Sequence, residues 1–171
     1  GILLGGDILA RTLRNPDNLP YLDQFFRLDN PNTHWARGNH DEMESDSLQW
    51  LERATGRPEF YFHQMGELGF LVLNTNLLYR YPWSVFAERC EESQKQFDLI
   101  KGLADTLPDI SHLLIIHHQT FPIVGNEEIR KKYNVIPPQT LFTCDSTITY
   151  LDRVYPLLQK IQNNGVQLVF L

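Results

Sequence analysis

Apolar runs and amphipathic stretches alternate along the chain, which is the pattern of an α/β protein. The runs "GILLGGDIL" at residues 1–9 and "GVQLVFL" at residues 165–171 predict buried strands, and "HLLII" predicts another. The segments "EFYFH" and "LGFLVLN" predict two strands joined by a tight turn at Gly66. A shorter strand is expected at residues 34–36. Strands separated by helices place the chain in the α/β class.

Apolar residues at helical spacing predict two helices between the first of these strands. Residues 18–29 predict a helix with Leu22, Phe25 and Phe26 on one face. The segment "SDSLQWLERATGRP" predicts a second helix, because its apolar positions recur at helical spacing. Gly56 followed by a proline is a stop signal for that helix.

Two more helices are expected in the second half of the chain. Residues 91–107 carry apolar side chains at helical spacing and predict an amphipathic helix. The last helix is expected to begin near residues 145–146 and to end at Gly165, with Pro156 either kinking it or displacing its start. Residues 119–144 read as an irregular segment rich in proline, glycine and aromatic residues. A loop of that length is usually functional or disordered.

Composition narrows the class of protein. A chain of 171 residues, 42% hydrophobic and 21% charged, fits a single globular domain over residues 1–171. The net charge of −6 argues against a general nucleic-acid binder, which usually carries a basic face. No apolar run reaches membrane-spanning length and no signal peptide is visible, so the sequence indicates no clear nucleic-acid or membrane partner. Cys90 and Cys144 are too few for a disulfide scaffold and leave two free thiols or one bridge open.

Polar residues follow several of the predicted strands at the point where each strand ends. Asp7 follows the first run, Asn39 and His40 follow the short strand, and His117 and His118 follow "HLLII". In open α/β sheets, sites form beyond the carboxyl ends of the strands. An aspartate after two glycines is by itself more often a turn residue, and a single histidine at a strand end is more often structural. The ordered set therefore indicates a site more strongly than any member does.

The segments "GGD", "GNHD" and "IIHH", in this order, resemble motif blocks of the calcineurin-like metallophosphoesterase superfamily, which includes purple acid phosphatases and many phosphodiesterases. The blocks of that family run Asp-x-His, Gly-Asp, Gly-Asn-His-Asp/Glu, a histidine, and Gly-His-x-His. The segments "FYFHQMGELGFLVLNTN" and "QKQFDLIKGLADTLPDISHLLIIHH" are similar to its hairpin and its helix before the fourth block. The resemblance covers nearly the whole chain.

The resemblance implies a four-layer αββα sandwich, in which two mixed sheets are flanked by helices. The first and last blocks of the family have no counterpart between Gly1 and Leu171. The chain is therefore expected to be the central segment of an incomplete domain, truncated at both ends and inactive by itself.

The resemblance also implies hydrolysis of phosphate mono- or diesters at a dinuclear centre, with a metal-activated hydroxide as the nucleophile. The cofactors would be two divalent ions, and ligands of mixed carboxylate and imidazole type suit Mn, Fe or Zn. Asp7 would bridge both ions, and Asn39 and His117 would hold one of them. The first histidine of the block is often the ligand in the family, which favours His117 over His118. The partner would be a phosphorylated small molecule or another phosphoester.

His40 and Asp41 have catalytic roles in this scheme. The imidazole of His40 would donate a proton to the leaving group, and Asp41 would orient that ring and raise its pKa. A non-catalytic relative that keeps the fold for binding is the alternative. An unrelated α/β hydrolase is disfavoured because the sequence has no Gly-x-Ser-x-Gly elbow.

Overall fold

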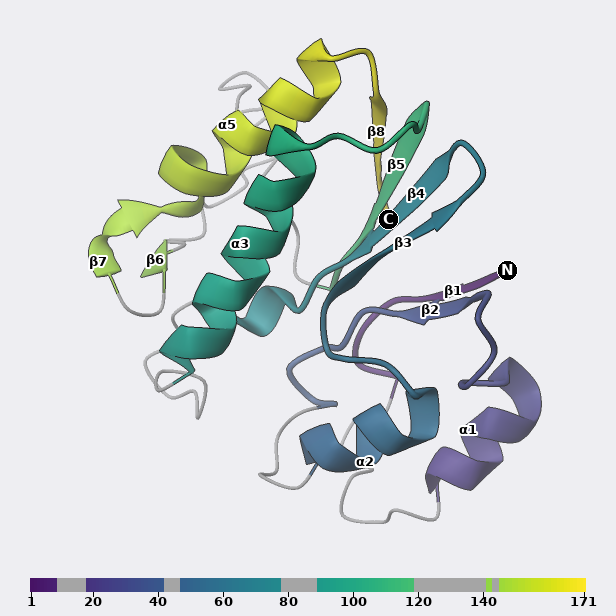
Figure 1. Cartoon of the computed structure of the whole chain (residues 1–171). Helices are drawn as coiled ribbons and strands as arrows, with labels where there is room; N and C mark the ends of the chain where they lie inside the picture. The colour runs from purple at the N-terminus through teal and green to yellow at the C-terminus, as the bar shows by residue number, and fades with distance from the viewer. Residues whose placement is uncertain (9–17, 42–46, 78–88, 119–140, 143–144) are drawn as a thin grey trace, which may run out of the picture. The chain divides into compact units, whose positions relative to one another are not determined.

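The computed structural model describes residues 1–8, 18–41, 47–77, 89–118, 141–142 and 145–171 (Figure 1). The chain divides into two compact units. The first unit comprises Gly1–Thr75, Asp109–His118 and Val166–Leu171, and the second comprises Asn76–Pro108 and Gln119–Gly165.

The first unit contains two sheets (Figure 1). Strand β1 (Ile2–Leu4) pairs in parallel with β2 (Thr33–Trp35). The second sheet has the order β3-β4-β5-β8, and its strands are β3 (Tyr61–Met65), β4 (Leu68–Val72), β5 (His112–Ile116) and β8 (Gln167–Phe170). β3 and β4 form the predicted hairpin, whose turn contains Gly66 at φ 60°. The α/β class is confirmed.

Helices cover one face of the β1–β2 sheet, and the second sheet lies on the other face. The helices are α1 (Asn18–Phe26) and α2 (Ser47–Thr55). The core on this side is formed by buried side chains from both strands, both helices and the loop after α1: Leu4, Leu19, Leu28, Trp35 and Leu51. A second core joins β2 to the four-stranded sheet through Ala36, Phe70, Val72 and Ile116. The unit therefore has three layers, helix, sheet and sheet.

Helix α1 is shorter than predicted, and Phe25 is not on its buried face. The helix ends at Phe26 because the next residue, Arg27, takes a left-handed backbone conformation with φ 47°. Leu19 is buried, and Leu22 and Phe26, three and seven residues further along, pack on the same face of the helix. Phe25 lies about 100° round the helix from Phe26 and is 61% exposed. The placement of Phe25 on the apolar face was wrong.

The two terminal strands are less buried than their apolar composition predicts. Leu3 in β1 is 40% exposed and Phe170 in β8 is 46% exposed. Within the described residues, each of these strands has a neighbour on one side only. An apolar run indicates a strand, but the neighbours available in the sheet decide how much of that strand is buried.

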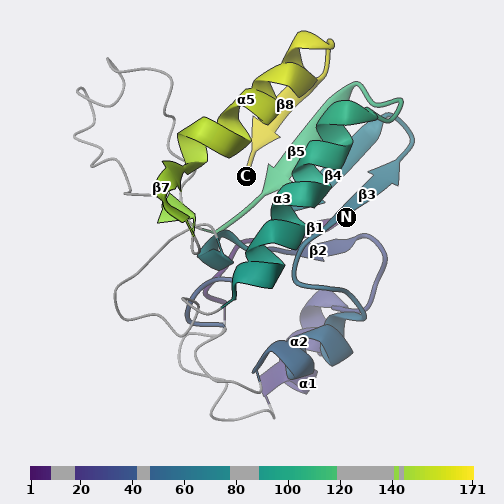
Figure 2. The same ribbon diagram turned by 60° about the vertical axis from the view of Figure 1, so that its left-hand side comes forward.

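The second unit is built on two helices that lie side by side (Figure 2). They are α3 (Cys90–Asp105) and α5 (Tyr150–Asn163). Lys160 Nζ lies 2.8 Å from Asp105 Oδ1, and the Arg153 guanidinium lies 4.7 Å from the centroid of the Phe97 ring. Within the described part of the chain, no helix of either unit is long and apolar enough to cross a membrane.

The start of the last helix was predicted about five residues too early. Asp145–Thr149 forms strand β7, which pairs in antiparallel fashion with β6 (Leu141–Phe142), and α5 begins only at Tyr150. The sequence "DSTIT" is rich in β-branched residues, which favour strands once a partner strand is present. Pro156 lies inside α5, and Gly165 follows its end at φ 93°, as predicted.

Cys90, at the start of α3, is disulfide-bonded. Among the described residues no cysteine is free. The only other cysteine of the sequence is Cys144, which lies outside the described residues. Of the two alternatives that the cysteine count left open, the structure contains the bridge.

His34 lies in the layer between the two sheets and is 2% exposed. Its ring stacks on Phe70 with centroids 4.6 Å apart, and its Nδ1 lies 3.1 Å from the Tyr61 hydroxyl. The His63 ring is 5.4 Å away. Burial lowers the pKa of His34 from 6.5 to about 4, and the positive charge of Arg57 adds to this effect. This environment is that of a structural core histidine.

We expect the stability of the protein to fall between pH 6.5 and pH 4. The unfolded chain protonates this imidazole below pH 6.5, whereas the folded protein resists protonation down to about pH 4. The free energy of unfolding should therefore fall by roughly 3 kcal/mol across that window, at about 1.4 kcal/mol per pH unit. Urea denaturation at several pH values would measure this, with His34→Gln expected to flatten the curve. An unchanged slope in His34→Gln would contradict the assignment.

Candidate metal centre

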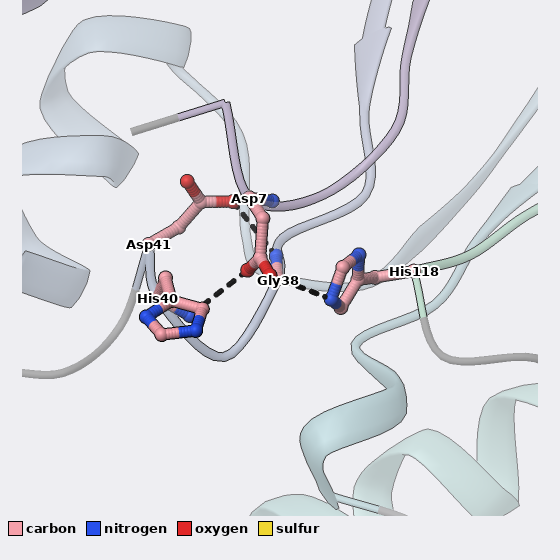
Figure 3. Close-up of polar contacts among 5 residues, drawn as sticks. All are labelled: Asp7, Gly38, His40, Asp41 and His118. Carbon is pink, nitrogen blue, oxygen red and sulfur yellow. Dashed lines mark hydrogen bonds and ion pairs between the residues drawn. The ribbon is translucent and has the colours of Figure 1, made fainter. Parts of the chain in front are cut away.

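Three strand ends of the first unit meet at one place (Figure 3). Asp7 follows β1, the turn that contains Gly38, His40 and Asp41 follows β2, and His118 follows β5. All of these residues belong to the same compact unit. The structure therefore brings together polar residues that are separated by more than 100 positions in the sequence.

The carboxylate of Asp7 lies at the centre of this arrangement. Its Oδ1 accepts a hydrogen bond of 2.9 Å from the backbone N–H of His40, and its Oδ2 lies 3.2 Å from Nε2 of His118 (Figure 3). The backbone of Asp7 is left-handed, with φ 61°. A residue other than glycine in this region is uncommon, although aspartate tolerates it better than most residues. The side chain is 28% exposed, so it remains reachable from solvent.

Asp41 is fully buried beside Asp7. Its Oδ2 accepts one hydrogen bond of 2.9 Å from the backbone N–H of Asp7 and another of 2.8 Å from that of Gly38 (Figure 3). The resemblance to the metallophosphoesterases predicts that Asp41 orients the ring of His40. The Nδ1 atom of His40 is buried and has no hydrogen-bond partner within the described residues. Two contacts of Asp41 are therefore with backbone N–H groups of two different loops.

Two glycines allow these loops to approach each other. A Cβ atom on Gly38 would collide with the backbone nitrogen and the carboxylate of Asp7. A Cβ atom on Gly6 would collide with the side chain of His118 and the backbone of Gly38. The glycines of "GGD" and "GNHD" are therefore required for close packing of the site as well as for turning the chain.

The two adjacent histidines after β5 have different surroundings. Side chains alternate along a strand, so His118 continues the face that carries Ile116, which packs between the two sheets. His117 continues the opposite face, and its ring meets Phe170 edge-on with centroids 6.2 Å apart. The resemblance to the metallophosphoesterases favours His117 as the metal ligand. The structure places His118, rather than His117, against Asp7.

The separation of Asp7 and His118 suits two ligands of one ion. Ligand bonds of 2.0–2.2 Å at tetrahedral or octahedral angles place neighbouring ligand atoms about 2.8–3.6 Å apart. The distance from Oδ2 of Asp7 to Nε2 of His118 is 3.2 Å. Within the described residues, no group of three or more His, Cys, Asp or Glu side chains could hold a metal ion. Asn39, whose amide was predicted as a ligand, lies in the same turn between Gly38 and His40 and is partly exposed.

One buried polar pair near the end of β4 was not predicted. The Asn74 side chain donates a hydrogen bond of 2.7 Å to Oε2 of Glu59, and both residues are buried. No local pattern in the sequence links Asn74 to a residue 15 positions earlier.

Comparison with known proteins does not identify a relative: no family model, no curated protein and no solved structure matches this chain.

Proposed function

We propose that this chain belongs to a hydrolase that cleaves phosphate mono- or diesters at a dinuclear metal centre of the calcineurin-like type. The observation that carries the proposal is the contact of Asp7 with His118 at the point where "GNHD" begins its turn. The order of these residues in the sequence follows the motif order of the family. Their convergence on one carboxylate supports a shared chemical role.

Each residue of the site has a role that suits its chemistry. Asp7 has two oxygens with two lone pairs each, so Oδ1 can accept the His40 N–H and still contact a cation. His118 offers Nε2 and Asn39 offers a neutral amide oxygen to the same ion. His117 is the alternative that the resemblance suggests. The two ions, when bound, would neutralise the charge of the phosphoester and lower the pKa of a bound water.

His40 is the residue we assign to the leaving group. Its backbone N–H donates to the Asp7 carboxylate, which keeps residue 40 next to Asp7. With Nδ1 buried, Nε2 is the nitrogen that we assign to proton donation.

The proposed architecture of the whole domain is the four-layer αββα sandwich. The three layers of the first unit support it, since two sheets already pack face to face with helices on one outer side. The second face of β4 and β5 carries Leu71, Leu113 and Ile115, each at most 1% exposed. A buried outer face is what a second helical layer would require.

Metal removal provides the direct test, made on the natural full-length protein. Treatment with EDTA followed by desalting is expected to abolish hydrolysis of p-nitrophenyl phosphate or bis-p-nitrophenyl phosphate, by roughly 10³-fold or more, because the ions supply several kcal/mol of transition-state stabilisation. Addition of Mn²⁺ or Zn²⁺ should restore activity, whereas Mg²⁺ addition serves as a control for ionic strength. Binding of Mn²⁺ without hydrolysis of any phosphoester would favour the non-catalytic alternative.

A further inference from the structure

The carboxylate of Asp41 connects two loops that are distant in the sequence. Asp7 lies 34 positions before Asp41, and Gly38 lies three positions before it. Both of their backbone N–H groups point at a single oxygen, Oδ2. We call these two hydrogen bonds the Asp41 bridge. Because Asp41 is 0% exposed, water cannot easily replace either bond.

The Asp41 bridge is one half of a reciprocal arrangement (Figure 3). Asp41 accepts from the backbone of Asp7, and Asp7 in turn accepts from the backbone of His40, the neighbour of Asp41. The loop after β1 and the loop after β2 are thus joined by three hydrogen bonds to carboxylates.

Asp7 needs such support because its backbone is strained. A left-handed conformation at φ 61° is unfavourable for a residue with a Cβ atom and persists where the surroundings fix it. The bond from its own N–H to Asp41 fixes the peptide on the amino side of that residue. The same bond determines where the Asp7 carboxylate is presented to His118.

We propose that Asp41 is a positioning residue that holds Asp7 and the turn after β2 in place before any metal is bound. The role depends on one acceptor oxygen at the right point and not on the charge of the side chain or on contact with the His40 ring. It rests on the proposed function in so far as the two loops carry the metal ligands. Asp41 then affects metal affinity by positioning Asp7 and Asn39. It does not itself bind the metal.

Three variants separate this role from its alternatives. Asp41→Asn keeps an acceptor oxygen at the same distance from the backbone but removes the charge. Asp41→Ala removes the acceptor. Leu71→Ala, at a fully buried position of β4, lowers stability without touching either loop. Should Asp41→Ala fail to fold, Asp41→Ser replaces it, because its hydroxyl ends one atom short of the Oδ2 position.

The first measurement is amide hydrogen exchange by NMR in the full-length protein without metal. The Asp7 and Gly38 amides are expected to be protected in wild type and in Asp41→Asn, and to lose that protection in Asp41→Ala. Loss of protection in Asp41→Asn as complete as in Asp41→Ala would overturn the proposal. So would protection that survives in Asp41→Ala.

The second measurement is Mn²⁺ affinity by isothermal titration calorimetry. Asp41→Ala should bind Mn²⁺ about 10–100-fold more weakly, the usual effect of losing a residue that orients a ligand, while Asp41→Asn and Leu71→Ala stay near wild type. A loss of affinity in Leu71→Ala equal to that in Asp41→Ala would show a general effect of stability and overturn the proposal. If wild type binds no Mn²⁺, the proposed function fails, and the amide exchange alone decides whether the Asp41 bridge holds the loops.

Discussion

Replacing His118 by alanine is expected to lower Mn²⁺ affinity by at least about 100-fold, beyond the usual effect of losing a residue that only orients a ligand. Hydrolysis of phosphoesters should fall by roughly 10³-fold at sub-saturating metal. The reason is that Nε2 of His118 lies 3.2 Å from Oδ2 of Asp7, at the spacing of two ligands of one ion. Metal content after desalting and the rate of p-nitrophenyl phosphate hydrolysis would measure both effects.

His117→Ala is the matched control for this experiment. It removes the neighbouring imidazole, which continues the opposite face of β5 and contacts Phe170. We expect His117→Ala to retain metal, because adjacent side chains at a strand end point to opposite faces. The reverse result, with metal lost only in His117→Ala, would support the assignment from the resemblance and refute the one from the structure.

His40→Ala is expected to leave metal content near wild type and to lower turnover by roughly 10²–10⁴-fold, the range for a lost general acid. The backbone of His40, not its ring, holds the Asp7 carboxylate, so removal of the ring should leave that hydrogen bond in place. The loss should be smaller for aryl phosphates with good leaving groups, because these leave without protonation. Rates for a series of aryl phosphates with different leaving-group pKa values would measure this dependence.

His112→Ala provides a control for the loss of an imidazole. His112 begins β5 and contacts Ser111, so it lies at the opposite end of that strand from His118. We expect activity close to wild type in this variant. Equal losses for good and poor leaving groups in His40→Ala, or loss of its metal, would show that His40 is not the general acid.

Local signals in the sequence were sufficient for most of the fold. Gly56, Gly66 and Gly165 take positive φ at the predicted ends of elements, because glycine reaches this region without steric cost. The predictions were wrong where tertiary neighbours determine the secondary structure or the burial of a residue. Residues 145–149 join a strand because β6 supplies a partner, and Phe25 is exposed because the core reaches only the face of α1 that carries Leu19.

Sequence alone also assembled the components of the candidate site, since Asp7, Asn39, His40 and Asp41 stand in motif order after predicted strands. It could not determine which neighbour each of them meets. Whether His117 or His118 faces Asp7 depends on which face of β5 packs toward the other sheet. The packing of the two sheets determines that face, and the five residues of β5 alone do not.

Asp41 shows most clearly the difference between what the sequence predicts and what the tertiary structure determines. Its sequence position beside His40 suggested a local partnership between neighbouring side chains. In the folded protein, its carboxylate accepts hydrogen bonds from the backbone of Asp7 and Gly38, which no local pattern in the sequence predicts. The sequence by itself determined the residue types, the strands and the turns, because these depend on local conformational preference. Only the tertiary structure decided which loops meet, because burial requires the N–H groups of both loops to find an acceptor, and Asp41 is the acceptor within reach.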